Sequence, residues 1–128
     1  MTADVVLRDG STLHLRPAVE ADRAGLPASF FSPLEIHGGW LRALHVDPPA
    51  RGVIVVGEVS GQLHVVGGYR RVGPAPDRAE VAMAVAAGLE GRGIGTRVLE
   101  LLAEHARAEG VRVFDAWVPR DARAVVDL

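Results

Sequence analysis

The chain has 128 residues, 48% of them hydrophobic, which suits one domain spanning residues 1–128. The formal net charge of −2 argues against a nucleic-acid partner, and the absence of cysteine excludes disulfides, cysteine nucleophiles and thiolate metal sites. No apolar run approaches the ~20 residues of a bilayer span and the first residues lack a secretory signal, so we expect a cytoplasmic protein without a membrane contact.

Alternating apolar residues predict a β-hairpin at the start of the chain. Val5 and Leu7 precede the turn signal Asp9-Gly10-Ser11, and Leu13 and Leu15 follow it. A short polar turn with glycine between two alternating segments is typical of a hairpin. We therefore expect the first two strands of the sheet here.

Two helices are expected next. Residues 17–30 carry a rough helical pattern of apolar positions, although Pro27 should kink or end that helix. Residues 33–44 predict a second, weaker helix, which Gly38-Gly39 would disturb.

The second half of the chain reads as strands around one strong helix. Residues 53–59 and 63–71 predict a second hairpin, in which Gly67-Gly68 suggests a bulge or a close backbone approach. Residues 78–86 predict a further strand. An amphipathic helix over 92–109 and a strand over 111–118 then follow a glycine-rich turn. This order predicts an α/β (α+β) fold, with one mixed central sheet and helices on both faces.

The glycine-rich turn, Glu90-Gly91-Arg92-Gly93-Ile94-Gly95-Thr96, is suited to an oxyanion. Glycines let an anion approach the backbone, and the first amides of the following helix are unpaired and carry partial positive charge. A P-loop needs a lysine, and the chain has none. A dinucleotide-binding fingerprint would need glycine at Thr96. A purely structural glycine turn stays open as the alternative.

The strand Ala79–Val85 followed by Gly91–Leu99 resembles the acyl-CoA-binding motif of the GNAT superfamily, Gln/Arg-x-x-Gly-x-Gly/Ala. Gly93 and Gly95 match its glycines, and Glu90 departs from its first position. Residues 5–11 and 15–17 are similar to the opening of the bacterial protein-lysine acetyltransferase branch. The resemblance, which covers about residues 4–121, implies a single GNAT-like domain that uses acetyl-CoA, as co-substrate, to acetylate a primary amine or protein lysine. It implies coenzyme A contacts from Met83, Val85, Gly91, Arg92, Gly93, Ile94, Gly95 and Thr96.

Glu80 is the candidate general base. An ammonium acceptor must lose a proton before it attacks the thioester, and Glu80 lies among apolar residues of the strand before the glycine turn. It also matches the glutamate that is the general base in the similar lysine acetyltransferases. The alternative is an ion pair with Arg70 or Arg78. Tyr69 is a weaker candidate for an acid, and the five histidines show no metal-ligand spacing, so we predict no metal.

The C-terminal part departs from the resemblance. GNAT domains normally continue past residue 118 with a helix and two strands, and Ala122–Leu128 would form only the first turns of that helix. The fold would be C-terminally shortened, and the strand over 111–118 would present an open edge. Open edges pair readily with other chains, which predicts a homodimer. The alternatives to an enzyme are a non-catalytic acyl-CoA-binding or regulatory domain and a structural oligomerisation module.

Overall fold

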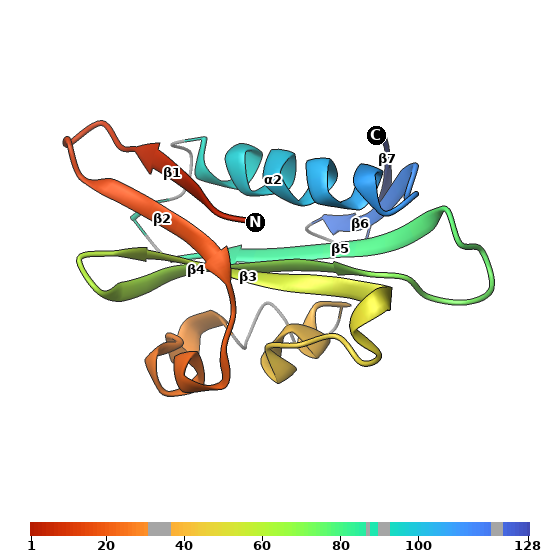
Figure 1. Cartoon of the computed structure of the whole chain (residues 1–128). Coiled ribbons are helices and arrows are strands. Elements are labelled where there is room, and N and C mark those ends of the chain that lie inside the picture. The colour runs from red at the N-terminus through yellow and green to blue at the C-terminus, as the bar shows by residue number, and fades with distance from the viewer. Residues whose placement is uncertain (31–36, 87, 90–92, 119–121) are drawn as a thin grey trace.

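The computed structural model describes residues 1–30, 37–86, 88–89, 93–118 and 122–128. One mixed sheet holds seven strands in the order of the chain (Figure 1). Every neighbouring pair is antiparallel except β5 and β6, which run parallel because α2 crosses between them. The strands are β1 (Ala3–Val6), β2 (Thr12–Pro17), β3 (Gly52–Val59), β4 (Gln62–Arg70), β5 (Arg78–Val85), β6 (Val113–Val118) and β7 (Ala122–Asp127), and the helix is α2 (Ile94–Ala108).

Both predicted hairpins are confirmed. At the first turn the Ser11 amide donates to Asp9 Oδ1 at 2.9 Å, and Gly10 takes a φ of 87° that favours glycine. In the second hairpin a register shift lies at Gly57/Glu58, so the bulge is not at Gly67-Gly68. Those glycines instead allow a close approach, because a Cβ on Gly68 would stand 2.6 Å from the Val53 carbonyl oxygen.

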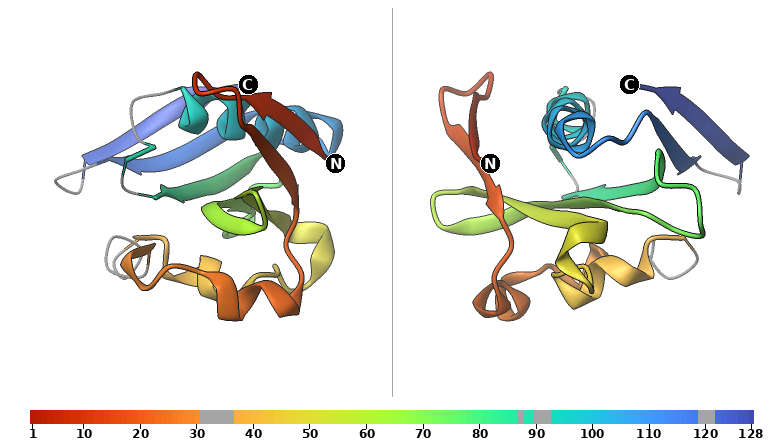
Figure 2. Two further views of the ribbon diagram at one scale, coloured as in Figure 1. Left: turned by 90° about the vertical axis from the view of Figure 1, so that its left-hand side faces the viewer. Right: turned by 45° about the vertical axis from the view of Figure 1, so that its right-hand side comes forward.

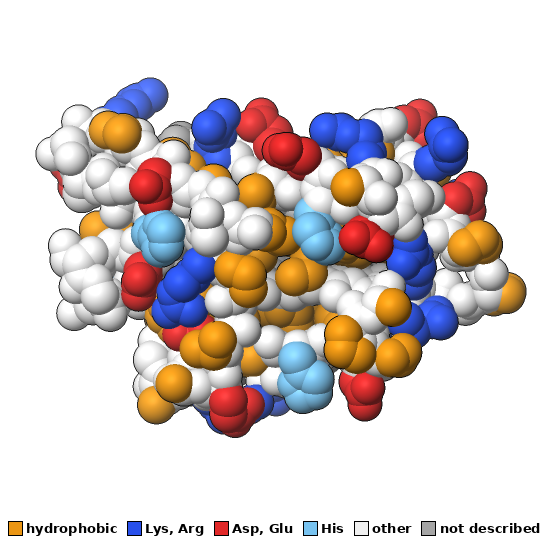
Figure 3. Space-filling view, in the orientation of Figure 1, with side chains coloured by type: hydrophobic (Ala, Val, Ile, Leu, Met, Phe, Trp, Pro, Cys, Tyr) orange, Lys and Arg blue, Asp and Glu red, His pale blue; other side chains and the backbone are white. Residues whose placement is uncertain are grey.

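Helical segments lie on both faces of the sheet, as predicted (Figure 2). The amphipathic α2 covers one face, and its buried residues Ile94, Val98 and Leu102 pack on Leu15, Val65 and Phe114 in a continuous core. Short 3-10 helices cover the other face, where Phe30 and Leu41 pack on Ile54, Val56 and Val66. Figure 3 shows charged side chains along the upper rim, at the level of α2, and hydrophobic ones across the middle.

The two helices predicted between the hairpins are replaced by 3-10 turns. The segment predicted as helix 17–30 forms η1 (Glu20–Gly25) and η2 (Ala28–Phe30), which Pro27 separates because its ring breaks the helical hydrogen bonding. The predicted helix over 33–44 lies partly outside the described residues, and its remainder contains η3 (Gly39–Ala43). A fourth turn, η4 (Pro49–Arg51), leads into β3.

The C-terminal prediction was wrong: Ala122–Asp127 is the strand β7 and not the start of a helix. It pairs antiparallel with β6 from Val113↔Asp127 to Val118↔Ala122. Val126 packs on the core while Val125 is exposed, the alternation of a half-buried strand. The β6 edge that was expected to be open is therefore covered within the chain. Among the described residues, no helix is long and apolar enough to cross a bilayer.

Candidate functional site

The N-terminus of α2 leaves backbone amides available to an anion. Gly93 is the N-cap residue in the left-handed region, with a φ of 78°, and no side chain caps the helix. The first intrahelical bond runs from the Arg97 amide to the Gly93 carbonyl at 3.1 Å. In the described part of the chain the amides of Ile94, Gly95 and Thr96 consequently have no acceptor, and no acidic residue lies in the first turn. Gly91 and Arg92, two of the predicted contacts, lie outside the described residues.

This first turn is held directly against β5. Ile94 is 1% exposed and packs in the core, which fixes the start of the helix. A Cβ on Gly95 would lie 3.5 Å from Met83 Sδ, so Gly95 and Met83 are neighbours. The structure thus brings together Met83, Gly93, Ile94, Gly95 and Thr96, all of which the sequence singled out.

The strands β5 and β6 separate next to this turn. Their parallel ladder ends at Val81↔Ala116, although β5 continues to Val85 beside β4. The Ala86 amide donates to the His64 carbonyl at 2.8 Å. Because the direction of the amides alternates along an antiparallel strand, the amides of Met83 and Val85 face away from β4, toward the opening beside β6.

Those two amides are free for a ligand. Among the described residues, neither has an acceptor on β6, because the ladder ends before them. An extended molecule in the opening could accept hydrogen bonds from Met83 and Val85 as an added strand would. It would run toward the N-terminus of α2, since Gly95 is next to Met83.

Glu80 sits on β5 opposite Arg70 of β4. Its Oε2 accepts from Arg70 Nη2 at 3.3 Å, and its Oε1 accepts from the Trp40 indole at 3.3 Å. The carboxylate side chain is 15% exposed. The Arg70 guanidinium also lies over the Trp40 ring, 4.8 Å from its centre. The ion pair considered from the sequence is therefore present, with Arg70; Arg78 pairs instead with Asp115 at 2.7 Å.

Glu80 and the core residues of α2 lie on opposite faces of the sheet. Val81 and Met83 pack under α2, whereas Ala82 and Ala84 pack with Trp40 and Leu41 on the other face. Because side chains alternate along a strand, Glu80 points to the face of the 3-10 helices. Glu80 nevertheless lies next to the opening beside β6, because it pairs with Asp115 just before the β5–β6 ladder ends.

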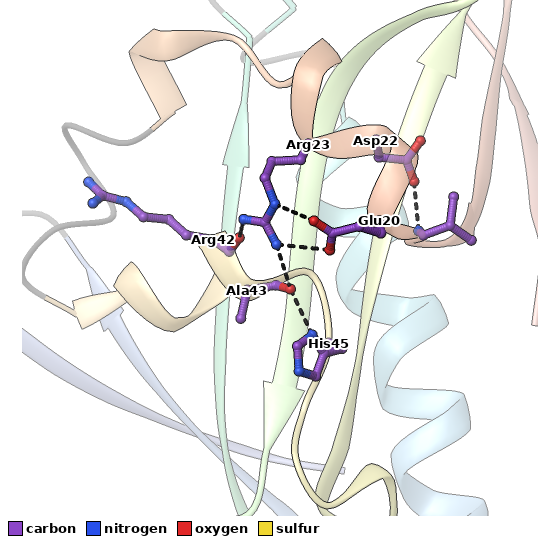
Figure 4. A network of polar contacts seen from close by, with 7 residues as sticks. Glu20, Asp22, Arg23, Arg42, Ala43 and His45 are labelled. Atoms are coloured by element: carbon purple, nitrogen blue, oxygen red, sulfur yellow. Dashed lines mark hydrogen bonds and ion pairs between the residues drawn. The ribbon is translucent and has the colours of Figure 1, made fainter.

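An arginine holds η3, and with it Trp40, in place. Arg23 of η1 donates to both carboxylate oxygens of Glu20, and to the Arg42 and Ala43 carbonyls of η3 (Figure 4). His45 Nδ1 lies 2.8 Å from the Ala43 oxygen. No local pattern predicts this contact, because about twenty residues separate Arg23 from η3 along the chain.

Tyr69 is a core residue and not an acid near the opening. It is 1% exposed, and its hydroxyl lies 2.7 Å from Nδ1 of His105, in the last turn of α2 and thus at the opposite end from Gly93. Burial, with a smaller contribution from Glu109, raises the pKa of Tyr69 to about 12. The packing interpretation of this tyrosine is the one that the structure supports. Over the ranges that the structure describes, no cluster of three or more His, Asp or Glu could hold a metal.

Known proteins share this architecture. The profile of the acetyltransferase (GNAT) family matches residues 26–128. The chain belongs to the GNAT acetyltransferase family. The GNAT domain of PAT from S. lividans is 30% identical, with a TM-score of 0.69, over 90% of this chain and 77% of that one. No curated protein matched the chain.

Two further solved members of this fold are informative. A cAMP-binding acyltransferase from Mycobacterium smegmatis is 26% identical, with a TM-score of 0.65, and this chain matches 39% of its length. A GNAT acetyltransferase from Brucella melitensis, solved in complex with acetyl-CoA, is 16% identical, with a TM-score of 0.68, over 91% of this chain and 88% of that one. At this identity the Brucella protein supports the fold. Membership of the family confirms the resemblance that was based on Gly93 and Gly95.

Proposed function

We propose that this GNAT domain transfers an acetyl group from acetyl-CoA to a primary amine, for which a protein lysine is one candidate acceptor. The observation that carries the proposal is the junction of two sets of amides that have no acceptor among the described residues: those at the start of α2, and those of Met83 and Val85 in the opening between β5 and β6. Together they match the two demands of coenzyme A, an anionic diphosphate and an extended amide-containing arm.

The diphosphate would bind at the N-terminus of α2. Amides and the helix dipole favour an anion there. The first turn of α2 contains no acidic side chain that would compete with the diphosphate for these amides. Gly91, Arg92, Gly93, Ile94, Gly95 and Thr96 are the proposed contacts, as the sequence suggested. Glu90 would repel a phosphate, but the contact rests on backbone amides, so we expect weaker binding and not its loss.

The arm and the thioester would follow β5. The Met83 and Val85 amides would bind the arm or polarise the thioester carbonyl, as oxyanion donors do. The acceptor amine would first lose a proton to Glu80. Its lone pair would then form the C–N bond as the C–S bond breaks, and the departing thiolate would take up the second amine proton, directly or through water.

The second candidate function is an acyl-CoA-binding domain without catalysis. The ion pair between Glu80 and Arg70 favours it, because this pair gives the carboxylate a structural role that needs no proton transfer. The two functions differ in one measurement. Thermal shift with CoA tests binding, and thiol release from acetyl-CoA with a panel of amines and lysine peptides tests transfer. CoA binding without thiol release would select the second function. The absence of both CoA binding and thiol release would contradict both functions.

The proposal retains a cytoplasmic location and a homodimer. Because β7 covers β6, we place the dimer contact on β7, which is now the outer strand at this end of the sheet. Cell fractionation tests the location, and light scattering tests the assembly.

A further inference from the structure

We propose that the acceptor carries a carboxylate, or an anion of the same shape, a few atoms from its amine, and that an arginine-lined cavity beside Glu80 binds this group. The inference rests on the proposed function and names the acceptor class. The cavity has a volume of about 310 Å³ and lies where η4 and the end of β4 meet η3. Its walls include Trp40, His45, Asp47, Arg51, Arg70 and Arg71.

The charge of this lining is positive. Three guanidinium groups face one carboxylate, that of Asp47. The side-chain partners of Arg51 and Arg71 are backbone carbonyls: those of Arg71 and Gly73 for Arg51, and those of Ala50, Pro76 and Glu109 for Arg71. Carbonyls satisfy hydrogen bonds without cancelling charge, so both cations keep a field that favours an anion.

Donors remain for that anion. Arg51 uses Nε and Nη2 in its contacts, and Arg70 uses Nε and Nη2 on Glu80. In the described structure, Nη1 of each arginine has no acceptor. Guanidinium groups bind carboxylates in a planar fork geometry that ammonium groups lack. The carbonyl contacts of Arg51 also hold its guanidinium in place before a ligand arrives.

The cavity adjoins the proposed base through two shared walls. Arg70 and Trp40 line it, and each also donates to the Glu80 carboxylate at 3.3 Å. A small amine whose carboxylate lies against Arg51 would therefore extend past Trp40 toward Glu80. An amine without a carboxylate would lack this anchor.

Binding is tested without turnover. The Trp40 indole N–H resonance, assigned with Trp40→Phe, is followed by NMR during titration with glutarate and with its neutral diamide. We expect a saturable shift with glutarate alone. Arg51→Gln should weaken glutarate binding by about tenfold, as for a lost charged hydrogen bond, while Arg51→Lys, which keeps the charge without the planar donors, should restore only part of it. Arg112→Gln removes an equal charge at an exposed position and should change little.

Turnover is tested in parallel, by thiol release with γ-aminobutyrate and its amide. The carboxylate should be preferred by about tenfold in kcat/KM, and Arg51→Gln should remove the preference. Equal use of both amines, or equal shifts with glutarate and its diamide, would overturn the inference and leave the acetyltransferase intact. Glutarate binding at Trp40 without transfer to any amine would instead contradict the enzyme and leave an anion site.

Discussion

At the scale of single residues, Gly95 and Gly93 have different reasons to be glycine. Gly93 has a φ of 78°, so a substitution there strains the backbone and confounds any binding assay. Gly95 is helical, and a Cβ would meet only Met83 Sδ at the ordinary distance of 3.5 Å. Gly95 is therefore the position at which ligand binding and folding can be separated.

We predict that Gly95→Val abolishes the thermal stabilisation by CoA, because a branched side chain would fill the space over the free amides. Gly95→Ala is the matched control: its single Cβ fits beside Met83, and alanine should stabilise the helix by up to ~1 kcal/mol. We expect CoA binding to persist in that variant. Calorimetric titration with CoA measures both. Normal affinity in Gly95→Val would place the diphosphate elsewhere.

The role of Glu80 is decided by removing its charge and keeping its shape. Glu80→Gln can still accept from Trp40, so the pocket should stay folded. Loss of a general base should lower kcat by ~10²–10⁴-fold with CoA affinity unchanged. The control is Glu58→Gln, which removes a carboxylate on β3 that lies 3.5 Å from Arg16. This variant should keep its activity. Turnover within a few-fold of wild type in Glu80→Gln would leave Glu80 as the ion-pair partner of Arg70 only.

At the scale of elements, sequence reasoning succeeded where the signal was local. The turns at residues 9–11 and 60–62 and the amphipathic helix each depend on neighbours within a few positions, and each formed as predicted. It failed for η1 and η3, which are held by partners far along the chain, such as Arg23 on the Ala43 carbonyl. The Trp40–Glu80 hydrogen bond spans forty residues, and no spacing rule anticipates it.

The element η1 is anchored by a buried carboxylate, which gives a pH prediction. Asp22 is 8% exposed; Arg16 donates to both its oxygens at 2.7 and 2.9 Å, and the Val19 amide donates at 2.8 Å. The hydrogen bonds from Arg16, and then that from Val19, lower the pKa of Asp22 below its usual 3.8 despite burial. A lowered folded-state pKa stabilises the fold above pH ~4, and this stability is lost as the pH falls through the folded-state value.

Asp22→Asn should therefore cost about 2 kcal/mol in the free energy of unfolding at pH 7, the scale of a charged hydrogen bond. The difference from wild type should shrink below pH ~4, as the wild-type carboxylate becomes protonated. Urea titrations at pH 7, 4 and 2.5 measure the effect. A difference that is constant with pH would mean that shape and not charge anchors η1.

At the scale of the whole molecule, the sheet ends at a different strand from the one predicted. Residues 122–127 were expected to continue as a helix because the resemblance suggested one, although Val125-Val126 and the alternation around them favour a strand. A strand there covers β6 and moves the free edge outward by one strand. The family resemblance thus predicted the fold class correctly and the end of the sheet wrongly.

The moved edge determines how a dimer would form. β7 pairs with β6 on one side, and Val125 on this strand is 57% exposed. An exposed edge strand is a template for pairing with a second copy, and a two-fold arrangement is the commonest closed assembly. We predict a dimer through β7, seen by light scattering at micromolar concentration as twice the 13.5 kDa of one chain.

Val125→Lys should convert that dimer to a monomer, because lysine on an edge strand opposes pairing. The fold should tolerate the change, since Val125 is opposite Asp115 in the β6–β7 register and opposite charges across strands are favourable. Val72→Lys places the same charge on another exposed valine, in the loop after β4, and should leave the dimer unchanged. A wild-type protein that scatters as a folded monomer would contradict the prediction, and would mean that an edge strand of six residues with Asp127 at its end is too short and too polar to pair.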